Sequence, residues 1–498
     1  MWRLFLALSL ATPPLTRGGH SVAAGGHHSL FLQDTAGGSV IVAGWNTQGQ
    51  LCNPEFGDEM VNLSPLQDMT LLGRSITSVA AGANYSVLIL NDSTILVCGS
   101  NAYGELGTGG GLQQATFPTP ALSNLPGSQT KYASVREVAA GINHTIFLTT
   151  AGEVWTVGRN DRGQLCNGNT EDSTVFHKSV FAGARAVAAG RSHTLLLSDY
   201  DSGKVYACGD NSKGQLGTGD SEPLHLTAQE VLSDVRGIAA GYDHSLFLLK
   251  NGSVLGVGDN SLGQLGMKAG PGRMQVSKPT LVPGLEGQTI IGVVAGGHHS
   301  LFLGKDGQVW GTGENDHGQL GDDSMTTRWG IVRVATPSGP VKDMATGPYH
   351  SIFVGENRIA YSTGRNSHGQ LGVGSKEDQD DPQMVLNSIA AQAHDPWRSH
   401  GPLQSAGQTT TTTTSSSTED ESWPGLAWWQ WLLLCSCLLI PFCLAGGVCI
   451  HETAPKTAVS LASREERAEA NRAWSRSLNE MDLSAEESRP MLTPNGAY

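Results

Sequence analysis

The amino-acid sequence predicts an all-β fold made of seven copies of one structural unit. Glycine accounts for 64 of the 498 residues, about twice its usual share, which indicates many tight turns and therefore many short strands. Two short motifs alternate along the chain and return about every 50 to 60 residues. This period is typical of propeller blades and similar arrays, in which each unit buries its apolar face against its neighbours.

The first motif is a turn of two small residues and a glycine, then two variable residues, a histidine, a Ser or Thr and an apolar run. Its copies read VAAGGHHSLFL from Val22, VAAGANYSVLIL from Val79, VAAGINHTIFL from Val138, VAAGRSHTLLL from Val187, IAAGYDHSLFL from Ile238, VVAGGHHSLFL from Val293 and MATGPYHSIFV from Met344. The second motif follows each copy and reads GWNTQGQLC, GSNAYGELG, GRNDRGQLC, GDNSKGQLG, GDNSLGQLG, GENDHGQLG and GRNSHGQLG.

The segment between the two motifs has the pattern of a β-hairpin. Residues 300–313 (SLFLGKDGQVWGTG) read as two apolar strands joined by a tight Asp-Gly turn. The segments LLLSDYDSGKVYACG and LFLLKNGSVLGVG have the same form. No amphipathic helical pattern lies between them, so each unit is predicted to consist of strands and turns.

The alternation of these motifs resembles the repeat of the regulator of chromosome condensation family, over about residues 22–374. The resemblance implies a seven-bladed β-propeller of four-stranded blades, here over residues 20–393. It also implies that the repeat is offset from the blade, so that a terminal strand closes the ring. Residues 382–389 are therefore expected to pair into the blade that begins with residues 22–32.

One histidine recurs at the same place in six of the seven repeats, and Tyr85 occupies the remaining copy. Six equivalent histidines on six blades cannot all bind one metal. We interpret them as a structural ring, buried after a turn and hydrogen-bonded to backbone. The extra His27 and His298 are assigned to no site. The six residues are His28, His144, His193, His244, His299 and His350.

The asparagine of the second motif occurs in every repeat, from Asn46 to Asn366. An Asn side chain can bond its own backbone two residues on and so form a turn, with the glycine three residues later taking an unusual φ. The glycine-rich stretch of residues 107–111 precedes no helix and is not a phosphate loop. The chain lacks GxSxG, HExxH and a paired-carboxylate constellation, so we predict no enzyme, no catalytic residue, no cofactor and no metal.

The cysteines outside the apolar C-terminal segment fall into two matching pairs. Cys52 and Cys166 replace the last glycine of the second motif, whereas Cys98 and Cys208 precede its first glycine in the next repeat. We predict the disulfides Cys52–Cys98 and Cys166–Cys208 between neighbouring units. The alternative is four small buried thiols, because alanine, valine and threonine fill the second position in other repeats.

The ends of the chain predict a single-pass type I membrane protein. Residues 1–19 resemble a secretory signal peptide, with a buried first strand as the alternative. Residues 425–450 are predicted to form one transmembrane helix, with a buried core helix as the alternative. They carry no charged side chain from 426 to 450, have three tryptophans near the start, and are long enough to span a bilayer. A Thr/Ser-rich linker is expected at 394–424 and a mostly disordered cytoplasmic tail at 451–498. The propeller is then extracellular or lumenal.

A secretory route makes N-glycosylation relevant. Sequons stand at Asn62, Asn91, Asn251, Asn84 and Asn143. Asn91 and Asn251 are expected on hairpin tips and therefore exposed, and Asn62 is a further candidate. Asn84 and Asn143 lie in the turn beside the histidine ring, where they are expected to be occluded.

The composition narrows the classes of function. The formal net charge is −14, and no basic face is evident, so nucleic acid is not an expected partner. We interpret the chain as a membrane-anchored module that binds a protein or a glycan, with residues 52–79 and 107–138 as candidate contact loops. The alternative is guanine nucleotide exchange on a small GTPase, the activity of the family's founding nuclear member, which requires a cytosolic propeller.

Overall fold

The computed structural model describes residues 21–33, 39–66, 74–120, 135–198, 202–268, 274–335 and 339–390. The segments expected as signal peptide, linker, membrane span and tail lie outside these residues, and so do residues 20 and 391–393 of the expected propeller. Within the described part of the chain, no helix has the length and apolar character needed to cross a membrane.

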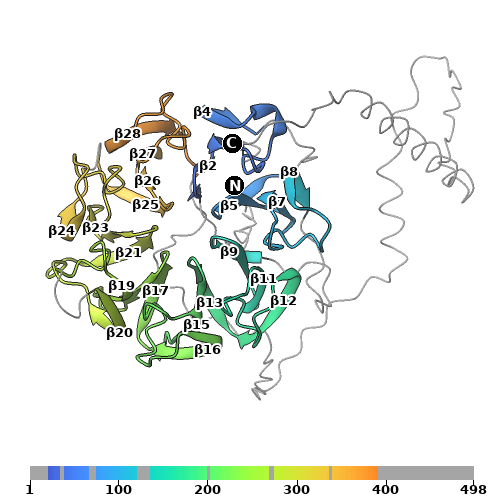
Figure 1. Ribbon diagram of the computed structural model, residues 1–498. Coiled ribbons are helices and arrows are strands. Elements are labelled where there is room, and N and C mark those ends of the chain that lie inside the picture. Colours follow the sequence, from blue (N-terminus) through green and yellow to red (C-terminus); the bar gives the residue numbers. More distant parts are fainter. Residues whose placement is uncertain are drawn as a thin grey trace, which may run out of the picture. The chain divides into compact units, whose positions relative to one another are not determined.

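The described residues form seven four-stranded antiparallel sheets that stand around a common axis like the blades of a propeller (Figure 1). This confirms the all-β, seven-bladed, four-stranded architecture. The first four blades are β1 (Val22–Ala24), β2 (His28–Leu32), β3 (Val40–Trp45), β4 (Glu59–Pro65); β5 (Ile76–Ala81), β6 (Tyr85–Leu90), β7 (Ile95–Ser100), β8 (Gln114–Pro120); β9 (Val135–Ala140), β10 (His144–Thr149), β11 (Glu153–Gly158), β12 (Ser173–Ala182); and β13 (Ala184–Ala189), β14 (His193–Ser198), β15 (Val205–Asp210), β16 (Leu224–Leu232).

The remaining blades follow the same order from the axis outward. They are β17 (Val235–Ala240), β18 (His244–Leu249), β19 (Val254–Asp259), β20 (Gln275–Leu281); β21 (Ile290–Ala295), β22 (His299–Gly304), β23 (Val309–Gly313), β24 (Arg328–Arg333); and β25 (Val341–Thr346), β26 (His350–Gly355), β27 (Ile359–Gly364), β28 (Gln379–Asn387). A short 3-10 helix, η1 (Pro54–Phe56), lies between β3 and β4.

The predicted offset between repeat and blade is wrong, because every blade is one continuous stretch of chain. The last strand, β28, pairs with β27 of its own blade and not with the first blade. Blade 1 is already complete from its own repeat, and the loop after β27 returns the chain directly to that strand's free edge. After β28, an isolated bridge between Gln33 and Ile389 and a hydrogen bond of 2.8 Å from Ala390 N to Leu32 O connect the chain to blade 1.

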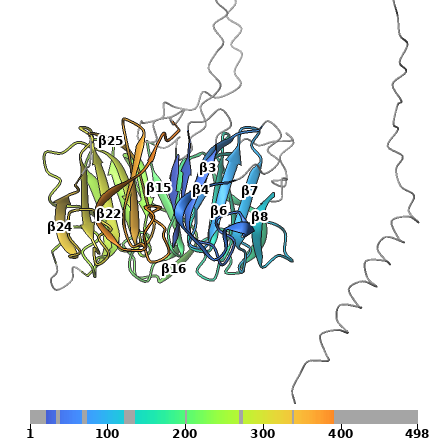
Figure 2. The same ribbon diagram turned by 90° about the horizontal axis from the view of Figure 1, so that it is seen from above.

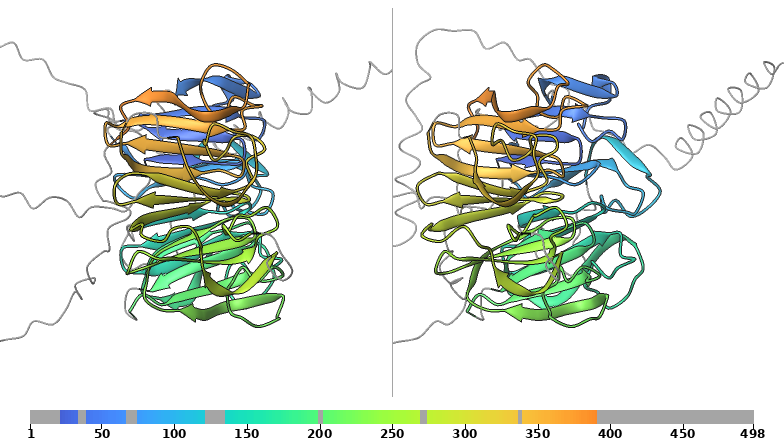
Figure 3. Two further views of the ribbon diagram at one scale, coloured as in Figure 1. Left: turned by 90° about the vertical axis from the view of Figure 1, so that its left-hand side faces the viewer. Right: turned by 60° about the vertical axis from the view of Figure 1, so that its left-hand side comes forward.

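The strands run between two faces of the ring, which Figures 2 and 3 show edge-on. The motif face carries the turns between first and second strands and the loops between third and fourth strands, which hold the two sequence motifs. The tip face carries the hairpins between second and third strands and the connections to the next blade. Both described ends of the propeller lie at the tip face, since Ser21 and Ala390 both bond to Leu32 at the end of β2.

The hydrophobic core lies between the blades. Seven clusters of buried side chains each join two neighbouring blades, including blades 7 and 1. The phenylalanine of the first motif occupies the same place in five of them, as Phe31, Phe147, Phe247, Phe302 and Phe353, each fully buried. Each blade therefore covers the apolar face of the next, as expected for a closed repeat array.

Candidate interaction surface and its scaffold

A closed ring of side-chain hydrogen bonds lies beneath the motif face. Each of the six recurrent histidines is fully buried, and its Nε2 lies 2.9 to 3.2 Å from the hydroxyl of a Ser or Thr in the next blade. Each of these hydroxyls donates to a backbone carbonyl of the second motif in the histidine's own blade, at 2.6 to 2.7 Å. The hydroxyl oxygen therefore accepts from the imidazole, which assigns the proton to Nε2.

Tyr85 continues this ring in the one repeat that lacks the histidine. Its hydroxyl donates to the carbonyl of His144 at 2.7 Å and lies 3.0 Å from Oγ1 of Thr145 in the next blade. Thr145 in turn donates to the carbonyl of Glu105. The structural interpretation of the histidines agrees with this geometry, although their partners are hydroxyl groups and the backbone is reached only through them.

The ring also explains the glycine before each histidine. A Cβ on Gly25 would lie 2.2 Å from Cε1 of His28 and 2.6 Å from the carbonyl oxygen of Gly82 in the next repeat. The imidazole thus lies directly over the glycine. Burial lowers the pKa of His28 to about 3 and of His144 to about 4, so the ring is neutral in the folded protein at ordinary pH.

The loops of the second motif are held by their own asparagine. In every repeat its Oδ1 accepts the backbone N–H five residues on, as between Asn315 and Leu320 at 2.8 Å, whereas a bond two residues on was expected. The glycine three residues after the asparagine has a positive φ in each repeat, 80° for Gly318, as predicted. These residues form a rigid scaffold that presents the variable residues of the loops.

The structure contains the disulfides Cys52–Cys98 and Cys166–Cys208, which are the two predicted pairs, and each joins neighbouring blades. The Cα atoms are 5.3 and 5.7 Å apart. Cys52 and Cys166 have φ of 60° and 54°, in the left-handed region. The other five repeats place glycine at this position, also with positive φ, so each disulfide holds a cysteine where the backbone favours glycine.

The sequons lie on different faces. Asn91 and Asn251 are exposed at hairpins of the tip face, and Asn62 is exposed on the outer strand β4. Asn84 and Asn143 are half-buried in turns of the motif face.

Sequence reasoning missed a cluster of rings on the motif face. We call it the aromatic sector: His27, Trp45, His317, Tyr349 and His368, contributed by blades 1, 6 and 7. The ring centroids of Trp45 and His368 are 5.3 Å apart in a stacked arrangement, and those of His27 and His368 are 5.2 Å apart edge to face. All five side chains are half-buried. The available signal was the concentration of His and aromatic residues at the variable motif positions of adjacent repeats.

Charged groups surround the aromatic sector. Asp378 accepts from Nδ1 of His317 at 2.7 Å, and a carboxylate oxygen of Glu59 lies 3.5 Å from Nδ1 of His368. The Arg365 guanidinium lies 5.4 Å from the centroid of the Tyr349 ring. Burial, assisted by the positive charge of Arg365, lowers the pKa of His27 to about 4 and keeps this ring neutral. The sector thus combines flat, partly apolar rings with charges of both signs at its rim.

The candidate contact loops of the sequence prediction are only partly described. Residues 67–73 and 121–134 lie outside the described part of the chain. Glu59, which belongs to the candidate loop of residues 52–79, contacts His368 of the aromatic sector. Lys376 of the last blade forms an ion pair with the same carboxylate.

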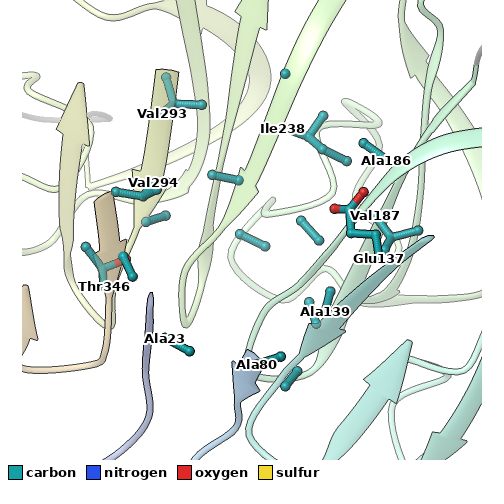
Figure 4. Close-up of a pocket in the computed structure, with 18 of the residues that line it drawn as sticks. Ala23, Ala80, Glu137, Ala139, Ala186, Val187, Ile238, Val293, Val294 and Thr346 are labelled. Atoms are coloured by element: carbon teal, nitrogen blue, oxygen red, sulfur yellow. The ribbon is translucent and has the colours of Figure 1, made fainter. Parts of the chain in front are cut away.

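The axis of the propeller contains a cavity of about 280 Å³ (Figure 4). The innermost strands of all seven blades line it, mostly with alanine and valine. Arg136, Arg185 and Arg236 also line it, together with Glu137. Among the described residues, no three His, Cys, Asp or Glu side chains come together in a way that could hold a metal ion.

Comparison with known proteins places this architecture in a family. The sequence model of the protein family described as the RCC1-like domain matches this chain twice, in the overlapping ranges 15–330 and 134–418. The chain belongs to the RCC1-like family. Among its relatives, the ultraviolet-B receptor UVR8 of Arabidopsis thaliana is 31% identical over 377 residues, which cover 73% of this chain and 81% of UVR8. The human E3 ubiquitin-protein ligase HERC2 is 30% identical over 339 residues, which are 66% of this chain but only 7% of HERC2.

A third relative and two solved structures complete the comparison. The secretion-regulating guanine nucleotide exchange factor of Bos taurus is 29% identical over 59% of this chain and 65% of its own length. Yeast RCC1 (Prp20), solved bound to Kap60, superposes with a TM-score of 0.63 at 22% identity, over 77% of this chain and 91% of that one. The crystal structure of human WBSCR16 superposes with a TM-score of 0.62 at 23% identity, over 70% of this chain and 94% of WBSCR16. The relatives support an interaction module, and the structures establish the fold.

Proposed function

We propose that this RCC1-like propeller is a membrane-anchored module that binds a protein partner through the aromatic sector of its motif face. The observation that carries the proposal is the set of mutually packed, half-buried rings contributed by blades 1, 6 and 7. Aromatic side chains supply large, rigid contact area and are enriched at the energetic centres of protein interfaces. A rim of charges of both signs, as around this sector, is the usual border of such an interface.

The positions of the first and last described residues support the use of the motif face. Ser21 and Ala390 lie at the tip face, and so do the exposed sequons Asn91 and Asn251. The last described residue before the expected membrane anchor therefore lies at the face opposite to the aromatic sector. Glycans at Asn91 and Asn251 would likewise leave the sector uncovered.

The topology is tested first, on the full chain expressed in cells. Sealed microsomes are treated with protease, and the protein is digested with endoglycosidase. We expect the repeats to be protected and Asn91 or Asn251 to carry a glycan. Unglycosylated repeats on the cytosolic side would contradict the anchored, lumenal arrangement.

The binding surface is tested on full-length protein at its native membrane by chemical cross-linking and identification of the captured proteins. Trp45→Ala and Tyr349→Ala are compared with Tyr103→Ala, which removes a half-buried ring from the motif face outside the sector. We expect the first two variants to lose about tenfold in capture of one specific protein while Tyr103→Ala retains it. Equal capture by all variants, or capture abolished by deglycosylating the partner, would contradict a protein interface at this sector.

The second candidate function is guanine nucleotide exchange on a small GTPase. It is favoured by the similarity to the secretion-regulating guanine nucleotide exchange factor and to yeast Prp20. The crystal structure of Prp20 was described together with its binding to Gsp1p and histones. A GTPase is reached only by a cytosolic propeller, so the microsome experiment separates the two functions. Release of labelled GDP from a panel of small GTPases, accelerated by the full chain, is the measurement for this alternative.

A further inference from the structure

The innermost strands of the blades share a β-bulge near the tip face. In blades 2 to 7, one residue of the first strand is unpaired between two registered neighbours. A bulge redirects the side chain of its extra residue. The bulged residues are Thr77, Arg136, Arg185, Arg236, Ile291 and Lys342.

Three consecutive blades, 3 to 5, thus place an arginine at the same level of the axial cavity, and these three line it. Two of them also connect blades. A guanidinium N–H of Arg185 donates to the carbonyl of Val235 at 3.0 Å, and one of Arg236 donates to that of Ile290. One such bond uses only one of the five N–H groups of a guanidinium. Nε of Arg236 has no hydrogen-bond partner within the described residues, and neither has the guanidinium of Arg136.

Apart from the three arginines, Glu137 and Thr346, the side chains that line the cavity are apolar. Figure 4 shows Ala23, Val187, Ile238 and Val293 around the space, with Glu137 as the charged group among the labelled residues. The arginines outnumber this carboxylate, in a chain whose formal net charge is −14. Burial lowers the pKa of the Arg236 guanidinium, so a bound anion would offset part of the cost of keeping its charge away from water.

We propose that the axial cavity binds an aliphatic carboxylate, with its hydrocarbon chain along the alanine and valine wall and its carboxylate at Arg136 and Arg236. A pocket with a mostly apolar lining and a few convergent polar groups is the usual form of a small-molecule site. Arginine matches the two oxygens of a carboxylate with parallel N–H donors. The volume of about 280 Å³ lies just below the usual range of ligand pockets, about 300–1,000 Å³, and therefore favours a hydrocarbon chain of medium length.

The test uses decanoate that carries a photoreactive diazirine and an alkyne, applied to cells that express the full chain. After illumination, the captured protein is digested and the labelled peptides are mapped. We expect labels on the first strands β9, β13 and β17. An excess of unlabelled decanoate should abolish this labelling by competition. An excess of decanol should leave the labelling unchanged, because decanol lacks the anionic group. Hexanoate and palmitate should compete at least about tenfold less well.

Three variants localise the site. Arg136→Gln removes a guanidinium that holds no other described group, and Ala188→Leu fills the cavity without changing any charge. Lys342→Gln is the matched control, since Lys342 occupies the same bulge position in blade 7, is exposed and does not line the cavity. We expect labelling to fall about tenfold in the first two variants and to remain unchanged in the control.

Two results would overturn the proposal. One is labelling that decanol competes as well as decanoate does, which indicates apolar adsorption. The other is labelling that persists in both Arg136→Gln and Ala188→Leu. Protease resistance of each variant, measured in the same cells, verifies that the propeller is folded. The two cavity variants change different residues, so if one of them fails to fold, the labelling of the other decides the test. Neither result depends on whether the motif face binds a protein.

Discussion

His350 in the last blade lies 2.9 Å from the hydroxyl of Ser29 in the first blade, across 321 residues of sequence. This hydrogen bond closes the polar ring at the seam between the first and last blades. Because no strand is exchanged between blades 7 and 1, the seam depends on this bond, on the cluster that contains Phe31 and Ile352, and on the short bridge at Ile389.

Ser29→Ala should destabilise the protein by roughly 2–4 kcal/mol. The substitution leaves two buried groups without a partner, Nε2 of His350 and the carbonyl of Gln370. Urea unfolding followed by tryptophan fluorescence measures the loss. Ser367→Ala, on an exposed loop of the last blade, is the control and should change stability by less than about 0.5 kcal/mol. Equal effects of both substitutions would show that the ring bond has no special role at the seam.

The protein should lose stability steeply as the pH falls from about 6.5 towards 4. Burial lowers the pKa of His193, His299 and His350 to about 3, whereas the unfolded chain binds protons near the ordinary value of 6.5. Within this window the unfolded state holds more protons, so each buried histidine lowers the unfolding free energy by up to about 1.4 kcal/mol per pH unit of acidification.

Unfolding midpoints in urea, measured from pH 7.5 to 4.5, determine that slope. His299→Gln should reduce the slope of unfolding free energy against pH by about the contribution of one histidine, whatever the effect of the substitution on stability at neutral pH. His177→Gln, which removes an exposed histidine, should leave the slope unchanged. A slope that is the same in all three proteins would contradict the assignment of the acid sensitivity to the ring.

Removal of the Cys52–Cys98 disulfide should cost about 4 kcal/mol, since the bond closes a loop with a sequence separation of 46 residues. Cys98→Ala leaves Cys52 in a left-handed conformation without its bond. The double variant Cys52→Gly/Cys98→Ala should therefore be more stable than Cys98→Ala alone, by about 1 kcal/mol. Peptide mapping without reduction, together with thermal unfolding, checks both statements, and free thiols at these positions would contradict them.

Glu105→Gln should stabilise the protein at neutral pH by about 1 kcal/mol. Glu105 occupies the place of a glutamine in the other six repeats, and burial raises the pKa of its carboxyl. The raised pKa means that the folded state loses stability as the pH rises above the ordinary glutamate value, a loss that the amide avoids. The gain should therefore shrink as the pH approaches 4.5, which thermal unfolding at several pH values would detect.

Glycopeptide mass spectrometry of protein from cells should find glycans on Asn91, Asn251 and Asn62, all three of which are exposed. Asn84 and Asn143 should be unmodified, because they are half-buried beside the polar ring. Asn91→Gln and Asn251→Gln should each increase electrophoretic mobility by one glycan, whereas Asn84→Gln should not. Full occupancy of Asn143 would contradict the assigned difference between the faces.

The sequence by itself determined the repeated unit and its scaffold. The recurrent histidine, asparagine and glycine positions are local requirements of each repeat, so their spacing predicts the number of blades. The two cysteine pairs could be assigned because they stand at the same two motif positions in successive repeats. These features follow from periodicity, which a single chain displays completely.

Only the tertiary structure decided which residues meet across blades. His27 appears in the sequence as an unexplained neighbour of His28, and its contacts with Trp45, Tyr349 and His368 arise because the ring brings residues from both ends of the chain together. The pairing of β28 within its own blade was likewise set by the nearest free strand edge, which the motif pattern does not encode. Closure of a ring turns distant repeats into neighbours, and contacts of that kind depend on three-dimensional geometry.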